Sequence, residues 1–248
     1  MLAGLDPLTL LGVLSAAFAG SILGGLAGYG TMLVLPALLA PLVGATQVVP
    51  ILAIAAILMN ASRLFVFWHE ISWPMARRVL LGVLAGTALG AVFFSGLSAR
   101  WASVFIGTVM ALMLLVRSRV PQLMARASGE RVGLWAFGYG CVSGGASGVG
   151  VFMIALLSAT GLAATPVVAT DAVVSLAGNV VKVITFGLAG AVSWRGLLLG
   201  LLIGLATVPG AFVARALARR LATRVHETIL NVLVVLGSAY LITQGLLG

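Results

Sequence analysis

The sequence predicts an all-α, polytopic integral membrane protein, and three observations lead to this fold class. Of the 248 residues, 62% are hydrophobic and only 8% are charged, whereas about a quarter of the residues in soluble domains are charged. Apolar stretches of about 17 to 25 residues recur along nearly the whole chain, and each is long enough to cross a bilayer as a helix. Glycine clusters, prolines and charges separate these stretches. The composition therefore excludes a water-soluble globule.

Five apolar segments are expected in the first half, at residues 8–26, 31–43, 47–67, 75–96 and 100–117. The first begins after Asp6-Pro7, an N-cap followed by proline at the first helical position. No positive charge precedes it, so a cleaved signal peptide is not expected. The cluster GGLAGYG (24–30) ends it, and WHEISW (68–73), whose tryptophans are typical of a membrane interface, separates the third segment from the fourth.

Five more segments follow the basic stretch RSRVPQLMARASGER (117–131), at residues 132–146, 150–162, 166–189, 194–214 and 225–246. The second glycine cluster, GGASGVG (144–150), interrupts the first two of them. Thr165-Pro166 is a cap and first helical residue for the third. We interpret the titratable pairs at 69–70 and 226–227 as interfacial, because each lies at the boundary of an apolar segment.

The two sets of five segments match in order and length, which predicts an internal repeat of about 120 residues. The first repeat covers residues 1–117, a basic cytoplasmic linker covers 118–131, and the second repeat covers 132–248, within one integrated transmembrane domain. Local matches agree: SILGGLAG (21–28) aligns with CVSGGASG (141–148).

Arginine positions predict the orientation of the two repeats. The loops 117–131 and 215–224 are both basic and should face the cytoplasm, so an even number of crossings must separate them. GGASGVG must then turn the chain back rather than kink one helix. This gives eight to ten transmembrane segments including broken or re-entrant short helices, both termini outside, and two repeats of inverted orientation. Such repeats with glycine-interrupted segments are typical of secondary transporters.

The two glycine clusters are candidate substrate sites. A helix that begins inside the membrane leaves backbone N–H groups without partners, and these groups favour an anion. The expected donors are the backbone or hydroxyls of Gly28, Gly30 and Thr31 in the first repeat and of Ser147, Gly148 and Gly150 in the second, with Ser21 and Ser143 as further hydroxyls. Alternatively, the glycines only allow close packing of helices.

Two cations lie within apolar segments, and each follows an asparagine by three residues on the same helical face: Asn60 with Arg63, and Asn179 with Lys182. A cation with amide and hydroxyl donors suits a small oxyanion, because charge-assisted hydrogen bonds are roughly twice as strong as neutral ones. The alternative is that both long side chains snorkel to the membrane surface.

Asp171 is the candidate for proton coupling. It precedes Lys182 by eleven residues, or about 16 Å along a helix, which is too far for a direct ion pair. It could instead balance a cation from another helix, or make a structural polar contact near the membrane surface. No Ser-His-Asp or paired-carboxylate arrangement is visible, so no enzyme is expected.

Few partners other than lipid and substrate are expected. The net charge of +9 is confined to short loops, which is typical of cytoplasmic loops and not of a nucleic-acid-binding surface. The single cysteine, Cys141, excludes an intrachain disulfide and a cysteine-based metal cluster, and two isolated histidines do not make a metal site. We expect no metal and no cofactor, and leave a homo-oligomer open.

The motifs resemble the TauE/SafE sulfite exporter family. The residues that carry the resemblance are GGLAGYGTMLVLPALL, GGASGVGVFMIALL, ATDAVVSLAGNVVK and TVPGAFVARALARRL, and they span nearly the whole chain. One departure is Leu156, which stands where the first repeat has Pro36. The resemblance implies transport of sulfite, sulfoacetate or other organosulfonates across the bacterial cytoplasmic membrane.

The expected function is therefore a secondary transporter for a small sulfur-containing anion that works by alternating access. Two alternatives remain open from the sequence. One is a passive anion channel of the same architecture, and the other is a membrane scaffold that transports nothing.

Overall fold

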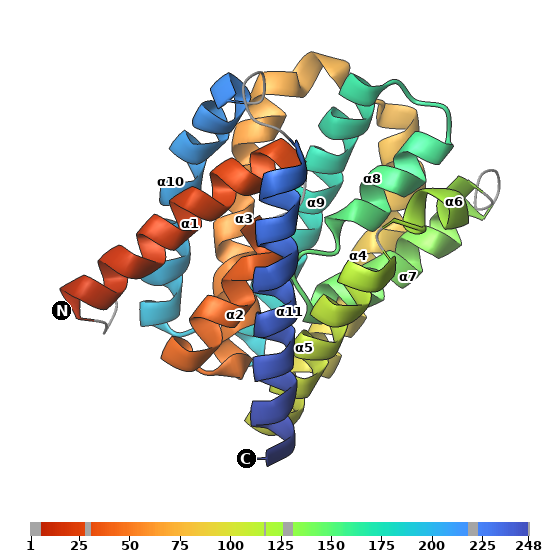
Figure 1. Cartoon of the computed structure of the whole chain (residues 1–248). Helices are drawn as coiled ribbons and strands as arrows, with labels where there is room; N and C mark the ends of the chain where they lie inside the picture. Colours follow the sequence, from red (N-terminus) through yellow and green to blue (C-terminus); the bar gives the residue numbers. More distant parts are fainter. Residues whose placement is uncertain (1–5, 28–30, 117, 126–130, 218–222, 248) are drawn as a thin grey trace.

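The structure is a computed structural model, and it describes residues 6–27, 31–116, 118–125, 131–217 and 223–247 (Figure 1). Helices make up these residues almost entirely, and no strand occurs among them. In chain order they are α1 (Pro7–Ala27), α2 (Thr31–Val43), α3 (Ala45–Phe67), the 3-10 turn η2 (Trp68–Glu70), α4 (Trp73–Ser95), α5 (Ala99–Val116), α6 (Val120–Ala125), α7 (Val132–Gly145), α8 (Gly150–Ala159), α9 (Ala164–Leu188), α10 (Trp194–Leu217) and α11 (Thr223–Leu247). The fold is all-α, as the sequence predicts.

All ten expected apolar segments are helices, and their bounds agree with the expected ones to within a few residues. The expected segment 31–43, for example, is α2, and 166–189 is α9. The short helix α6 was not expected, because it lies within the basic stretch between the two halves. Apolar runs bounded by glycine, proline or charge thus predict these helices well.

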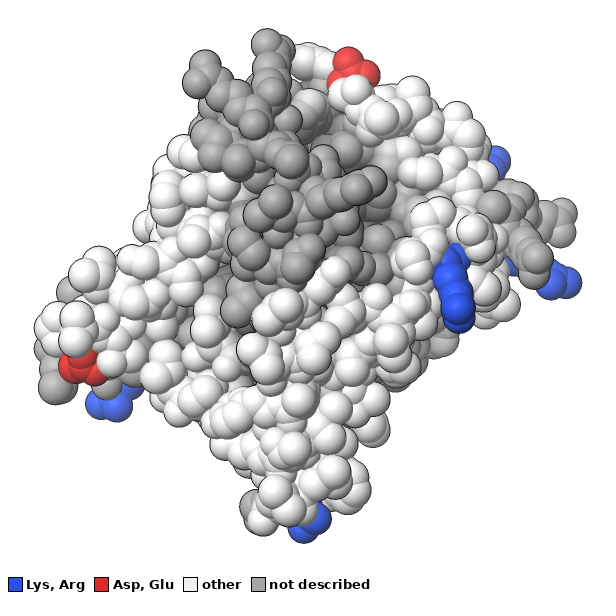
Figure 2. Space-filling model, viewed as in Figure 1, with Lys and Arg blue, Asp and Glu red and all other residues white. Residues whose placement is uncertain are grey.

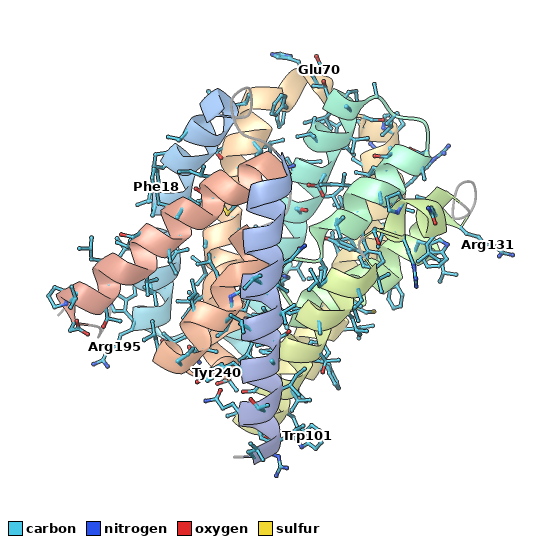
Figure 3. All side chains as sticks on the ribbon, in the orientation of Figure 1. Phe18, Glu70, Trp101, Arg131, Arg195 and Tyr240 are labelled. Carbon is cyan, nitrogen blue, oxygen red and sulfur yellow. The ribbon has the colours of Figure 1, made fainter. Side chains whose placement is uncertain are left out.

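Among the residues that the structure describes, four helical stretches are long and apolar enough to cross a membrane by length and composition: Ala45–Glu70, Trp73–Ser95, Ala99–Val116 and Ala164–Leu188. Figure 2 shows few charged side chains among the described residues of one face, and most of them lie near its margins. Exposed tryptophans lie at both ends of the bundle, Trp68 near Glu70 and Trp101 near the opposite end (Figure 3). The chain is a multi-pass membrane protein, because several of its helices are long and apolar enough to cross a bilayer.

The cluster GGASGVG breaks the helix, as expected. The helix α7 ends at Gly145, Ala146 is extended with φ −137° and ψ 164°, and Gly148 has a left-handed φ of 82°, which glycine adopts without steric cost. The following helix α8 then runs beside α6, since Ser158 and Ala159 near its end share a small depression with Pro121 of α6. The chain therefore turns back at this cluster instead of continuing along α7.

The glycines of this cluster do two different things. A Cβ on Gly144 would meet the Thr87 carbonyl oxygen of α4, and a Cβ on Gly145 would lie 2.9 Å from the Phe105 ring. These two glycines allow close helix packing. A Cβ on Gly150 would meet nothing within 4 Å, so this residue shapes the break and not the packing. Close packing therefore accounts for Gly144 and Gly145 but not for Gly150.

The helices α4 and α7 form an especially close interface. A Cβ on Gly82 of α4 would lie 2.5 Å from the Gly133 oxygen of α7, and a Cβ on Gly140 of α7 would lie 2.6 Å from the Val83 oxygen of α4. Gly86 and its neighbours continue the contact along the same face. The two helices run parallel, because residues later in α4 contact residues later in α7. Small residues at such an interface let the two backbones approach.

The remaining helix pairs follow one pattern. The helices α3 and α9 are antiparallel, because Gln47 at the start of α3 donates to the Ala191 oxygen after α9, at 3.0 Å. The helices α5 and α11 are also antiparallel, since Arg100 at the start of α5 donates to the Leu246 oxygen at the end of α11. The parallel pair α4 and α7 has a counterpart in α1 and α10, where Gly210 packs on Ser21.

Two inverted repeats predict this pattern. A two-fold axis in the membrane plane would pair α3 with α9 and α5 with α11 in opposite directions, and would exchange the pair α4–α7 with the pair α1–α10. We propose this arrangement for the chain, with residues 1–117 and 132–248 as the two repeats.

Candidate functional site

A cavity of about 390 Å³ lies where the two halves of the chain meet. Its walls come from α3 of the first half, from α9 and α10 of the second, from single residues of α1, α2 and α4, and from the break between α7 and α8. The lining is mostly apolar, with a few polar side chains, which is the usual character of a small-molecule site. Among the described residues that line it, Arg63, Asp171 and Lys182 carry formal charge.

The Lys182 side chain is buried in this cavity with 7% of its surface exposed. Its Nζ atom donates a hydrogen bond to the carbonyl oxygen of Ala146, at 3.3 Å. No carboxylate of a described residue forms an ion pair with it. The alternative of a snorkelling lysine is therefore wrong for Lys182, because the ammonium points at the helix break and not at the membrane surface.

The Ala146 carbonyl follows the last residue of α7, where the helix dipole concentrates partial negative charge. Lys182 thus compensates the end of α7 as well as lining the cavity. An ammonium group has three N–H donors, and the bond to Ala146 uses one of them. The structural contact and a contact with a bound anion are therefore compatible.

Arg63 forms an ion pair with Asp171, with 3.2 Å between Nη2 and Oδ2. The pair joins α3 to α9, and the two side chains are 36% and 3% exposed, respectively. Asp171 therefore balances a cation from another helix, which is one of the roles that the sequence left open for it. Arg63 correspondingly differs from the sequence prediction of a free donor, because its charge is already compensated.

Three side chains extend this ion pair into a network. The Asn60 oxygen accepts from Arg63 Nη1 at 3.3 Å, and the Ser175 hydroxyl donates to Asp171 Oδ1 at 3.2 Å. The Tyr139 hydroxyl of α7 interacts with Ser175. A chain of polar contacts therefore connects α3, α9 and α7 along one wall of the cavity.

The two asparagines line the cavity, but their amides are committed to their own helices. Asn60 Nδ2 donates to the Ala56 oxygen at 2.9 Å, and Asn179 Nδ2 donates to the Ser175 oxygen at 2.8 Å. No hydrogen bond joins Asn179 to Lys182. Both asparagines lie at the cavity, as the sequence predicts, but they do not form two similar donor pairs with the cations. Each amide keeps at most one N–H for a ligand.

The start of α8 faces the same cavity. Ser147, Gly148, Val149 and Gly150 all line it, and the first turn of a helix leaves N–H groups without intrahelical partners. Of the sequence-predicted residues in the first cluster, Gly28 and Gly30 lie outside the described residues, as does the side chain of Thr31. The site is therefore described from the second repeat, together with Asn60 and Arg63 of the first.

Sequence reasoning missed four polar residues of the cavity, namely Ser62, Tyr139, Ser175 and Thr207. A signal for Ser175 was present, because it lies midway between Asp171 and Asn179 at four-residue spacing, which places all three on one face of a helix. Tyr139 precedes Ser143 by the same spacing on α7. In an apolar helix such a polar stripe indicates a wet or ligand-binding face.

A metal centre finds no support in the described part of the chain, where no group of three His, Cys, Asp or Glu side chains is placed to hold an ion. Cys141 is a free thiol on α7. The available donors in the cavity are ammonium, guanidinium, amide, hydroxyl and backbone N–H groups. Such a donor set is suited to an anionic ligand.

Comparison with known proteins gives one result. The model of the family described as sulfite exporter TauE/SafE matches residues 13–241, which include every helix that lines the cavity. Neither the curated proteins nor the solved structures give a match. Because the family model covers nearly the whole chain, the chain belongs to the sulfite exporter TauE/SafE family.

Proposed function

We propose that the chain is a secondary transporter that moves a small sulfur-containing anion across the bacterial cytoplasmic membrane by alternating access. The substrate class is sulfite, sulfoacetate or another organosulfonate. Family membership supports the coarser statement that the protein is a membrane exporter of sulfite or related sulfur anions, and we propose no enzymatic activity. The finer steps rest on the cavity.

Lys182 is the observation that carries the proposal. A buried cation is costly unless a counter-charge compensates it, and no carboxylate of a described residue does so for Lys182. A bound anion would supply the missing negative charge. The neighbouring start of α8 at Gly150 supports this role, because backbone N–H groups and the helix dipole at that end also attract an anion.

The residues proposed to bind substrate are those named from the sequence, with roles adjusted by the geometry. Lys182, Ser147, Gly148 and Gly150 form the primary contacts. Asn60 and Asn179 contribute one amide N–H each, and Arg63 contributes when its ion pair with Asp171 opens. The first cluster, Gly28, Gly30 and Thr31, is proposed by analogy with the second.

Alternating access requires that the cavity open to one side of the membrane at a time. The antiparallel pair α3 and α9 supports this mechanism, because it brings one wall from each proposed repeat to the cavity. The proposed orientation has both termini outside and the loops 117–131 and 215–224 in the cytoplasm. Asp171 is the proposed coupling residue.

The test is counterflow of radiolabelled sulfite in sealed proteoliposomes that contain the purified full chain. We expect transient accumulation of label when the lumen is preloaded with unlabelled sulfite or sulfoacetate, because a carrier exchanges one bound substrate for another. Entry of label that is independent of preloading would indicate an anion channel. No entry with any sulfur anion, from protein that is monodisperse, would indicate a scaffold and would contradict the proposal.

A further inference from the structure

The charges in the cavity constrain the charge of its ligand. The described lining residues contribute the Arg63 guanidinium, the Asp171 carboxylate and the Lys182 ammonium. With Asp171 ionised these groups carry a net charge of one positive unit, and with Asp171 protonated they carry two. The Asp171 and Lys182 side chains are almost fully buried, whereas that of Arg63 is 36% exposed. Solvent therefore compensates the Asp171 and Lys182 charges poorly, and a bound anion would complete the charge balance.

A singly charged anion neutralises the cavity while Asp171 is ionised. The ion pair between Arg63 and Asp171 at 3.2 Å stays closed, and the anion takes its charge compensation from Lys182 and the start of α8. No proton is required for this state.

A doubly charged anion leaves one negative unit uncompensated unless a proton accompanies it. The anion and the Asp171 carboxylate compete for the same guanidinium, since Arg63 lines the cavity and contacts Asp171 at the same time. A proton on Asp171 removes the attraction that holds Arg63 and releases the guanidinium to the anion. Protonation of Asp171 therefore supplies the missing positive charge and also frees the Arg63 guanidinium to bind the anion.

We propose that Asp171 matches the charge of the site to the valence of the anion, so that monoanions cross alone and dianions cross with one proton carried on the Asp171 carboxyl. The proton comes from water on the loading side and returns to water on the release side, and no covalent bond to the anion forms. This inference rests on the proposed function, because it needs an anion that is carried through this cavity.

The surroundings of Asp171 agree with a single protonation site. The helix α3 presents Arg63, α7 presents Tyr139, and Ser175 on α9 donates to the carboxylate. The turn η2 packs on α9, and the Ser72 amide that follows the turn donates to the Thr170 hydroxyl, but His69 and Glu70 of the turn are exposed.

The other elements packed against α9 bring no closer charge. On α4, Arg77 and Arg78 are exposed at the start of the helix, and the described lining residues of α4 and α8 are uncharged. Asp171 is therefore the one carboxylate among the described residues of the cavity, and it is the group that can accept the proton.

Sulfoacetate and isethionate test the inference as a matched pair. Both carry a sulfonate on a two-carbon chain, but sulfoacetate has a carboxylate where isethionate has a hydroxymethyl group, so they are a dianion and a monoanion at neutral pH. A pH-sensitive dye in the lumen reports protons while radiolabel reports the anion, with the membrane potential clamped. In wild-type proteoliposomes we expect lumenal acidification with sulfoacetate entry and none with isethionate entry.

The variant Asp171→Asn fixes the site at two positive units. We expect sulfoacetate to enter without acidification, and isethionate to bind at least as tightly as in the wild type, because the anion then compensates one of two otherwise uncompensated cations. Acidification that persists in Asp171→Asn would mean that the proton travels on the substrate carboxyl, and would overturn the inference. Equal proton movement with isethionate in the wild type would do the same.

The double variant Arg63→Gln/Asp171→Asn keeps the test decisive if the single variant does not fold, because removing both members of a buried pair is tolerated better than removing one. Its site carries one fixed positive unit from Lys182. We expect proton-free isethionate transport and loss of about tenfold or more in sulfoacetate affinity. Proton-coupled sulfoacetate transport by this variant would overturn the inference. Failure of the proposed function can be told apart from failure of this inference, because neither sulfonate would then show counterflow in the wild type.

Discussion

Replacing Lys182 by methionine removes the cation from the cavity at nearly constant volume. The ammonium is buried and has no carboxylate partner among the described residues, so a bound anion would be its main counter-charge. A hydrogen bond to a charged group contributes about 1.5 to 3 kcal/mol. Because about 1.4 kcal/mol corresponds to a tenfold change in affinity, the Kd for sulfite should rise by about 10- to 100-fold in Lys182→Met.

The same substitution also affects the fold, and this effect can be separated. Lys182 donates to the Ala146 oxygen at the end of α7, and a carbonyl left unsatisfied in a buried site costs about 1 to 3 kcal/mol. The melting temperature of the ligand-free protein should therefore fall in Lys182→Met, unless water in the cavity replaces the bond. Affinity and ligand-free stability must be measured on the same preparation.

The assay is a thermal-shift titration of purified protein with sulfite, sulfate, thiosulfate, sulfoacetate and taurine, since a ligand that binds the native state raises its stability. Lys182→Arg keeps the charge and should retain most of the shift. Arg195→Met removes an exposed cation at the start of α10 and should change nothing. Sulfite binding to Lys182→Met with wild-type affinity would refute the role of this lysine in the site.

Three further predictions concern the walls of the cavity. Gly86→Ala should lower stability by about 1 to 3 kcal/mol through overpacking, because the new Cβ would meet the α7 backbone. Gly138→Ala is the control and should be neutral or stabilising, because its Cβ would meet nothing within 4 Å. Equal melting temperatures for the two variants would contradict the close α4–α7 interface. Arg63→Ala should lower stability by less than the about 3 to 5 kcal/mol of a fully buried pair, because the Arg63 side chain is 36% exposed while that of Asp171 is buried. Adding Asp171→Ala should restore part of that loss, and an additive double variant would show that the pair is not coupled. Tyr139→Phe should slow sulfoacetate transport more than isethionate transport in the proteoliposome assay, because it removes a hydroxyl that extends the network around Asp171; equal slowing would indicate a purely structural role for Tyr139.

The helices were predictable from sequence because their signals are local. Apolar length, Asp6-Pro7 and the glycine clusters act on neighbouring residues, and α2 and α9 begin and end close to their expected bounds. The prediction of Thr165 as a cap is wrong, because α9 begins at Ala164 with Ala163 as its N-cap and without a side-chain cap. The turn at Gly148 was also predictable, because counting crossings between basic loops excluded a straight helix. Only a residue without a side chain adopts its left-handed φ of 82° easily.

The contacts of the site were less predictable because they join distant helices. Helical spacing places Asn60 beside Arg63, but it says nothing of Asp171, which comes from another helix. The same holds for Lys182 and the Ala146 oxygen. The sequence therefore identified several of the residues that line the cavity, whereas the compensation of Arg63 and the burial of Lys182 follow from how α3, α7 and α9 pack.

The glycines show why composition alone leaves alternatives open. Gly140 and Gly144 permit close approach of α4 and α7, while Gly148 turns the chain and Gly150 begins α8. All four lie within one short stretch of sequence. Their roles differ because only tertiary packing decides which side of each glycine meets a neighbour.

The central claim is that an anion binds at the break between α7 and α8, in contact with Lys182. Selenite, the selenium analogue of sulfite, tests it directly, because an anomalous difference map from crystals grown with selenite locates the selenium atom. We predict a peak within hydrogen-bonding distance of Lys182 Nζ and the backbone amides at the start of α8. A selenium peak elsewhere in the bundle, with this break unoccupied in protein that transports sulfite, would contradict the account.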